Sequence, residues 1–84
     1  MRLWIKIIKG ERVAHGIVRE VRGDYDGLTA DMRTVCEELD IPTPMILRSR
    51  FKQLEEFNIL KLMPNDFIES VNFDWLCLEN CVES

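Results

Sequence analysis

The two prolines at positions 42 and 44 constrain the fold of this chain more than any other feature. Proline disfavours a helical conformation in the residue before it, so a helix that approaches Pro42 must end near Ile41. Proline is well tolerated in the first turn of a helix, where its missing N–H needs no partner, and Thr43 can cap a helix that starts at Pro44. Residues 41–44 therefore predict a tight turn between two helices.

The sequence on either side of these prolines has helical periodicity. Before them, apolar residues recur at Leu28, Met32, Val35 and Leu39. Either Asp26 or Thr29 can cap this first helix, which we expect at about 27–40. After them, an apolar stripe runs through Leu47, Phe51 and Leu54, and Asn58 is a suitable left-handed stop. We expect the second helix at about 44–57.

The N-terminal third of the chain is rich in β-branched residues. Residues 2–9 and 12–21 are apolar runs separated by a turn that contains glycine, which predicts a β-hairpin. Val13, Ile17 and Val21 also recur every four residues, so a helix over 11–21 is the competing interpretation. Gly16 weakens the second strand and is a candidate for a bulge.

A further strand is predicted at the C-terminal end, over residues 71–81. It alternates and then becomes apolar on both faces, which is typical of a strand well inside a sheet. Residues 59–70 contain a turn and a short strand, or a wing of two short strands. The pattern predicts one α+β domain over 1–84 with two layers. The hairpin and the last strand form a mostly antiparallel sheet, with the first strand central and both helices on one face.

The charge of the chain is divided unevenly along its length. The net charge is −4, yet residues 1–23 hold six Lys or Arg against two Asp or Glu. The apolar runs are interrupted by charges too often to span a membrane, and Arg2, Lys6 and Lys9 argue against a signal peptide. The three cysteines include no CxxC pair, so we expect a reducing compartment and a cytoplasmic protein.

An apolar sheet face is the first candidate site. If Trp4, Ile8, Val18, Leu76 and Leu78, with Ala14, share the face away from the helices, that face is a surface for a protein partner or a homodimer. The alternative is that residues from the 59–70 segment fold over it, namely Leu62, Met63, Phe67 and Ile68.

The basic residues of the hairpin form the second candidate. A patch for an acidic partner or RNA could contain Lys6, Lys9, Arg12, Arg19 and Arg22, with His15. Only Trp4 and Tyr25 lie near them in sequence, whereas a platform for single strands needs several stacking aromatics. The alternative is a solvated sheet edge that the acidic C-terminal region neutralises.

A helix-turn-helix or winged-helix site for nucleic acid is the third candidate, with contacts from Arg48, Lys52 and Lys61. The acidic surroundings of the two helices oppose it, because affinity for DNA comes largely from phosphate neutralisation. Arg50 falls within the apolar arc of its helix, so we expect it to lie along the core or to pair with an acid.

No motif in the sequence supports catalysis or a cofactor. His15 is the single histidine, no serine or cysteine stands in a nucleophile motif, and no glycine-rich loop could bind phosphate. Cys77 and Cys81 on one strand would lie roughly 13 Å apart, too far to share a metal. We expect no enzyme, no metal site and no small-molecule substrate.

Four short motifs carry a resemblance. The runs DIPTP at 40–44, EEFN at 55–58, PNDFIE at 64–69 and NFDWLCLEN at 72–80 resemble a group of short uncharacterised bacterial proteins. The resemblance covers the C-terminal half well and the hairpin loosely. It implies a self-contained small protein, and no activity or site residue carries over from it.

Together these features predict a non-enzymatic domain that acts by binding another macromolecule. The leading hypothesis is a protein partner or a homodimer, because an apolar sheet face and a divided charge favour contact with proteins. The alternative hypothesis is nucleic-acid binding through the second helix.

Overall fold

The β-branched N-terminal runs form the expected hairpin. The computed structural model describes residues 1–81, in which β1 (Arg2–Lys9) pairs antiparallel with β2 (Arg12–Glu20). The connecting residues Gly10 and Glu11 both have positive φ, as a type I′ turn requires. Ile7 pairs with His15 and Ile8 pairs with Val13, so Ala14 is the extra residue of a bulge. The strand interpretation of 11–21 is confirmed, and the bulge lies at Ala14 rather than at Gly16.

Helix α1 (Tyr25–Leu39) follows the hairpin and begins slightly earlier than predicted. Its cap is Asp24, whose side chain accepts a hydrogen bond of 3.0 Å from Gly27 N. The prediction of Asp26 or Thr29 as the cap is wrong, because both lie inside the helix. The helix ends at Asp40, a left-handed residue whose N–H bonds to carbonyl groups of the last turn.

Helix α2 (Arg48–Phe57) begins four residues later than the prolines predicted. The predicted start at Pro44 with Thr43 as cap is wrong. Pro44 instead forms a β-bridge with Phe67, and Met45 N donates to Asp66 O at 2.8 Å, so these residues are held in an extended conformation. Eight residues, 40–47, therefore separate the helices. Asn58 ends α2 with a φ of 60°, as expected.

The remaining strands complete the sheet. β3 (Ile59–Leu62) is followed by a 3₁₀ turn (Pro64–Asp66) and by β4 (Trp75–Asn80), and the strand order over the described residues is β2-β1-β4-β3. The predicted central position of the first strand is confirmed, as is the internal position of the last. The last strand starts at Trp75 rather than at residue 71. The wing is wrong, because residues 63–70 contain no strand that pairs with β3.

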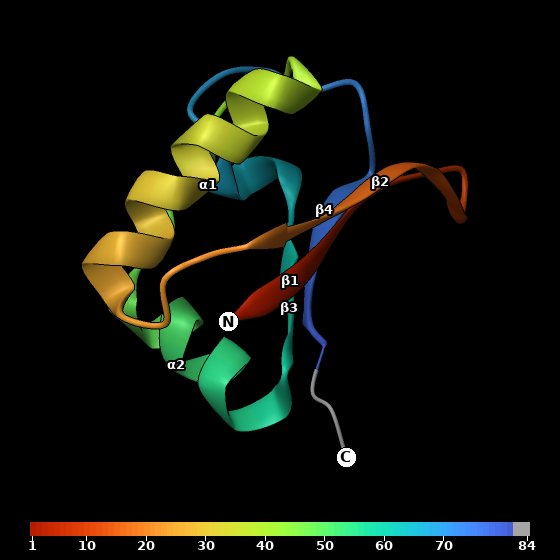
Figure 1. The fold of residues 1–84 in the computed structure, drawn as a ribbon. Coiled ribbons are helices and arrows are strands. Elements are labelled where there is room, and N and C mark those ends of the chain that lie inside the picture. The colour runs from red at the N-terminus through yellow and green to blue at the C-terminus, as the bar shows by residue number, and fades with distance from the viewer. Residues whose placement is uncertain (82–84) are drawn as a thin grey trace.

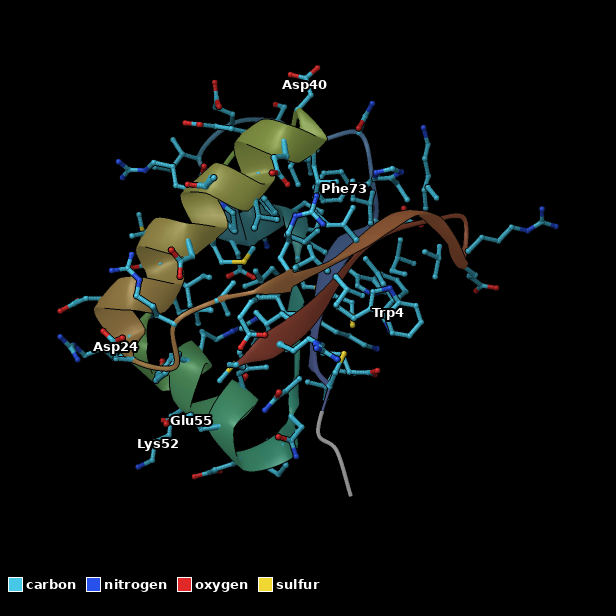
Figure 2. All side chains as sticks on the ribbon, viewed as in Figure 1. Trp4, Asp24, Asp40, Lys52, Glu55 and Phe73 are labelled. Atoms are coloured by element: carbon cyan, nitrogen blue, oxygen red, sulfur yellow. The ribbon has the colours of Figure 1, made fainter. Side chains whose placement is uncertain are left out.

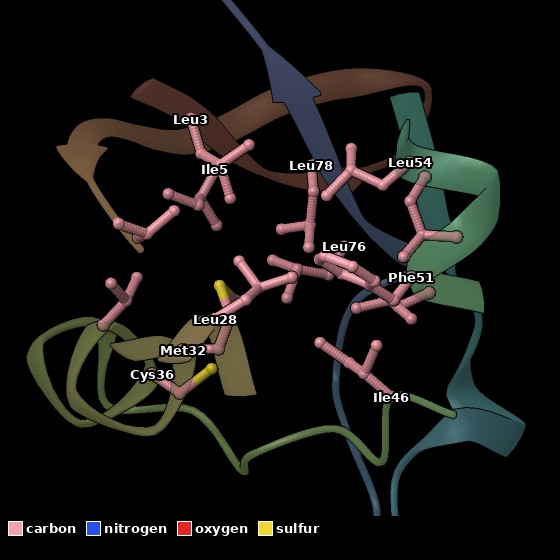
Figure 3. Close-up of a cluster of buried hydrophobic side chains, with 14 of the residues drawn as sticks. Leu3, Ile5, Leu28, Met32, Cys36, Ile46, Phe51, Leu54, Leu76 and Leu78 are labelled. Carbon is pink, nitrogen blue, oxygen red and sulfur yellow. The ribbon is translucent and has the colours of Figure 1, made fainter. Parts of the chain in front are cut away.

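The sheet and the helices form two layers with the core between them (Figure 1). Both α1 and α2 lie on one side of the sheet, as the pattern predicted. Figure 3 shows that the core side chains come from every layer: Leu3 and Ile5 from β1, Leu76 and Leu78 from β4, Leu28, Met32 and Cys36 from α1, and Phe51 and Leu54 from α2. Each fully buried leucine contributes about 1.5–3 kcal/mol to the hydrophobic stabilisation. Among residues 1–81, no helix is long and apolar enough to cross a membrane.

Candidate interaction surface

The sheet has a second face that neither helix covers, which we call the outer sheet face. Successive side chains of a strand point to opposite faces, and paired residues of antiparallel strands share a face. Because Leu3, Ile5, Leu76 and Leu78 point into the core, their neighbours in β1 and β4 point outward. The outer sheet face is therefore made by Trp4, Lys6, Ile8, Val13, Val18, Ile59, Lys61, Trp75, Cys77 and Glu79.

Large apolar side chains on this face are in contact with solvent. Trp4 is 38% exposed, Val13 51%, Val18 47% and Ile59 39%, and together they represent three of the four strands. Figure 2 shows Trp4 on the side of the sheet away from α1 and α2. A protein this small seldom exposes several large apolar side chains on one sheet face without a function for that face.

The Trp4 ring is held in place by its neighbours on two strands. A Cβ atom at Gly16 would lie 3.1 Å from Trp4 Nε1, so the indole extends across β2 over the glycine. On its other side, Lys6 Nζ lies 4.0 Å from the ring centroid in a cation–π contact. Lys6 Nζ also lies 3.7 Å from Glu79 Oε1. The position of Trp4 is thus held by contacts within the protein itself.

Trp75 repeats this arrangement toward the other edge of the sheet. Lys61 Nζ of β3 lies 5.0 Å from the Trp75 ring centroid. Cys77 lies between the two tryptophan–lysine pairs, since it is opposite both Lys6 and Lys61, and it is almost fully buried. Burial raises the pKa of the Cys77 thiol, so this cysteine acts as an apolar part of the surface.

The structure divides the apolar set that the sequence suggested. Trp4, Ile8 and Val18 do lie on the outer sheet face, and Ala14 is exposed at the bulge. Leu76 and Leu78 do not, because both are fully buried against the helices. Their assignment to the outer sheet face is wrong, because alternate residues of β4 face the core. The residues of β4 on the outer sheet face are Trp75 and Cys77 instead.

The basic residues of the hairpin do not form one patch. Lys6 lies on the outer sheet face, whereas Arg19 is opposite Leu3 on the helix side, where its Nε is 3.1 Å from Glu38 Oε2. Arg22 bonds to Asp31 of α1 and lowers the pKa of that carboxyl, chiefly through their side-chain hydrogen bond. Lys9 and Arg12 lie opposite each other on β1 and β2 at the turn end of the hairpin. His15 is exposed and lies opposite Ile7. Several of these charges are neutralised locally, by Glu38, Asp31 and Glu79.

The predicted nucleic-acid contacts are also separated. Arg48 lies at the start of α2 with its guanidinium 4.5 Å from the Tyr25 ring, and Lys52 is exposed on the same helix. Lys61 points from the opposite side of the sheet. A helix-turn-helix joins its helices by a turn of about 3–4 residues, whereas a much longer segment connects α1 and α2. Arg50 bonds to the Lys61 carbonyl and pairs with Asp66 at 3.2 Å, so its predicted pairing with an acid is confirmed.

A separate apolar hollow lies between the segment that precedes α2 and the end of the 3₁₀ turn. It has a volume of about 200 Å³ and is lined mainly by Met45, Leu47, Phe67 and Ile68. Leu62 and Phe67 are buried in the core, whereas Met63 and Ile68 are exposed beside this region. The alternative prediction that these four residues fold over the outer sheet face is therefore wrong.

Sequence reasoning missed Val13, Ile59, Trp75 and Cys77 as parts of the outer sheet face. The signal that could have found them is the pairing of β1 with both neighbours, because Ile8 is opposite Val13 and Trp75. Pairing is not visible in a single strand. Within residues 1–81, no group of three or more His, Cys, Asp or Glu side chains is placed to hold a metal ion.

No family model, curated protein or solved structure matches this chain. The resemblance to short bacterial proteins therefore stays a prediction.

Proposed function

We propose that this chain is a non-enzymatic binding domain that contacts a partner protein through the outer sheet face. The observation that carries the proposal is the set of exposed apolar side chains on a face that no helix covers, which includes Trp4 and, opposite it on the neighbouring strand, Val18. Aromatic side chains held in place before binding lose little conformational entropy when a partner arrives, so they are efficient anchors for a protein interface.

The charges on the face favour a partner that is apolar and acidic. Lys6 and Lys61 flank Cys77 and hold ammonium groups over the tryptophan rings. In a symmetric dimer through this face, Lys6 and Lys61 of both copies would share an apolar interface with the Glu79 carboxylates alone, and the two surplus buried lysines would be costly. A partner with a carboxylate near Lys61 avoids that cost. The overall charge of −4 and the pairing of Lys6 with Glu79 favour protein over nucleic acid.

The test uses tagged full-length chains expressed in cells and a pair of matched substitutions. Val18→Asp places a charge on the outer sheet face, and Ile68→Asp places one at an apolar residue elsewhere that is more exposed than Val18. We expect a partner that is recovered with wild type and with Ile68→Asp but not with Val18→Asp. The purified partner should then bind the purified chain directly, with at least a tenfold weaker Kd for Val18→Asp.

Other results would contradict the proposal. Equal recovery with all three chains would show that the outer sheet face is not the contact surface. Sedimentation of the purified chain over a concentration series tests the homodimer that the sequence also suggested. A dimer that Val18→Asp and Ile59→Asp both abolish would show that the outer sheet face binds a second copy of the chain and not a different protein.

A further inference from the structure

The edge of the sheet at β2 presents backbone groups that no strand in the described part of the chain pairs with. Met1 and Val21 exchange both backbone hydrogen bonds, at 2.8 and 2.7 Å. In an antiparallel pair such residues alternate with residues whose N–H and C=O point away from the partner strand. Gly16, Val18 and Glu20 therefore point their backbone groups outward from the edge.

The free stretch of this edge is short and is closed at both ends. At one end Arg22 N, on the next alternate residue, donates to Asp31 Oδ2 of α1 at 2.8 Å. At the other end the bulge at Ala14 interrupts the regular ladder. The free backbone groups therefore lie symmetrically about Val18, because the two other outward residues are equally distant from it along the strand.

We propose that two copies of the chain pair antiparallel through their β2 edges, about a two-fold axis at Val18. In this register Val18 is opposite Val18 of the second copy, and Gly16 is opposite Glu20, so every free N–H and C=O of the stretch finds a partner. The two four-stranded sheets become one continuous sheet. This inference goes beyond the proposed function, because it uses the edge and leaves the outer sheet face free for the partner protein.

The side chains on the outer sheet face are compatible with this register. The Val18 side chains of the two copies lie side by side, and each is opposite Trp4 of its own copy, so the exposed apolar side chains form one continuous row. Glu20 lies beside Gly16 of the second copy, which has no side chain. No like charges are therefore set directly opposite each other on this face.

The helix side of the edge is also compatible with a second copy. Arg19 is opposite Ile17 of the second copy, and it keeps Glu38 of its own copy as its acid partner at 3.1 Å. Arg19 Nη1 donates to the Val18 carbonyl at 2.9 Å. A carbonyl oxygen has a second lone pair, which remains available to the Val18 N–H of the second copy.

The charges beyond the paired stretch favour a second copy over a foreign strand. Because the two β2 strands run antiparallel, the turn of each hairpin is directed toward the start of α1 in the other copy. This turn carries Lys9 and Arg12, and neither forms an ion pair within the described residues of its own copy. The start of α1 carries Asp24 and Asp26. A second copy brings this complementary charge with the strand, whereas a foreign strand offers the backbone groups alone.

The test is sedimentation of the full-length chain over a concentration series, with a matched pair of substitutions. Glu20→Pro removes an outward N–H, and proline is tolerated on an edge strand where the N–H faces solvent. Glu20→Ala is the control, because it removes the same side chain and keeps the N–H. We expect wild type and Glu20→Ala to form dimers with similar Kd, and the Kd of Glu20→Pro to be at least about tenfold higher.

A mixed sample of isotope-labelled and unlabelled wild-type chains tests the register. In an antiparallel ladder, the Cα atoms of a pair that is not hydrogen-bonded lie about 4.5 Å apart. Pairing about Val18 makes such a pair of Ile17 and Arg19 of the second copy, so we expect a nuclear Overhauser effect between their Hα protons across the two chains. The amides of Gly16, Val18 and Glu20 should exchange more slowly at high than at low protein concentration.

Other results would overturn the inference. These are a wild-type chain that stays monomeric at concentrations up to about 1 mM, a dimer that Glu20→Pro leaves unchanged, or a dimer without the contact between Ile17 and Arg19. If Glu20→Pro loses its circular dichroism spectrum, that contact in wild type decides alone. A dimer that Ile59→Asp abolishes belongs to the outer sheet face and not to the edge.

The inference and the proposed function can fail separately. A monomeric chain that still recovers a partner protein, and loses it in Val18→Asp, would remove the paired edges and leave the proposed function in place. A dimer with the expected register that recovers no such partner would support the paired edges and contradict the proposed function.

Discussion

At the scale of single residues, Asp24 determines where α1 begins. Its carboxylate accepts from Gly27 N, and it satisfies one of the donors that the first turn leaves unpaired. We expect Asp24→Ala to lower the free energy of unfolding by about 0.5–2 kcal/mol. Thr29→Ala is the control, since Thr29 Oγ1 only donates to the Asp26 carbonyl within the helix. Urea unfolding measures both, and an equal loss in the two variants would show that Asp24 is not the cap.

Cys36 gives the stability of the protein a dependence on alkaline pH. Burial raises the pKa of its thiol from 9.0 to about 11. The unfolded chain loses this proton near pH 9 and the folded chain only near pH 11, so the contribution to stability is complete below pH 9 and disappears between these values.

We expect the free energy of unfolding of wild type to fall between pH 8.5 and 11 by up to about 2–3 kcal/mol more than that of Cys36→Ala. The comparison with Cys36→Ala removes the effect of Cys77, whose thiol pKa is also raised by burial. Denaturant unfolding at several pH values measures the difference. If the two chains lost stability in parallel, the thiol would not be the cause.

At the scale of elements, the orientation of β4 decides which residues form the core. Leu78 is opposite Ile5 on one side and Leu60 on the other, and it is fully buried. We expect Leu78→Ala to lower the free energy of unfolding by about 2–5 kcal/mol. Val18→Ala on the outer sheet face should cost less than about 1 kcal/mol. A larger loss for Val18→Ala than for Leu78→Ala would show that the assignment of the buried and the outer face of the sheet is wrong.

Strand β4 also shows where the sequence stops being informative. Residues 75–78 are apolar at every position, so alternation cannot distinguish the inward from the outward set. The facing depends on the register with β1 and β3, which only the folded sheet defines. The hairpin was predictable because its β-branched runs and its glycine turn are local signals.

The connection between the helices failed as a prediction for a different reason. Pro44 has the right chemistry for a first helical turn, but its bridge to Phe67 keeps it extended. That contact joins residues far apart in sequence, so no local rule could anticipate it. The same tertiary contact removes the tight turn on which a helix-turn-helix depends, and so it weakens the nucleic-acid hypothesis together with the helix boundary.

At the scale of the whole molecule, one sheet carries two apolar faces with a single layer of helices. Two short helices cover one face of the sheet. Residues 63–74 contribute Phe67 and Phe73 to the core on that side and do not cover the outer sheet face. The candidate surface therefore follows from a shortage of covering elements. Its composition could be guessed from Trp4 and Val18, but its extent depended on the order of the strands.

The outer sheet face should be dispensable for folding if it serves a partner. Threonine keeps the β-branched shape of valine and isoleucine while it adds a hydroxyl that water can solvate. We expect the triple variant Val13→Thr, Val18→Thr and Ile59→Thr to keep its free energy of unfolding within about 1 kcal/mol of wild type, because these side chains are already exposed to solvent for about half or slightly less of their surface. The variant should also bind less of the dye ANS, which reports exposed apolar surface.

The matched control is Met45→Thr with Ile68→Thr at the separate hollow, which should leave the ANS signal of the outer sheet face in place. A loss of several kcal/mol in the triple variant would mean that this face belongs to the core of the folded chain, and its role in binding would have to be abandoned.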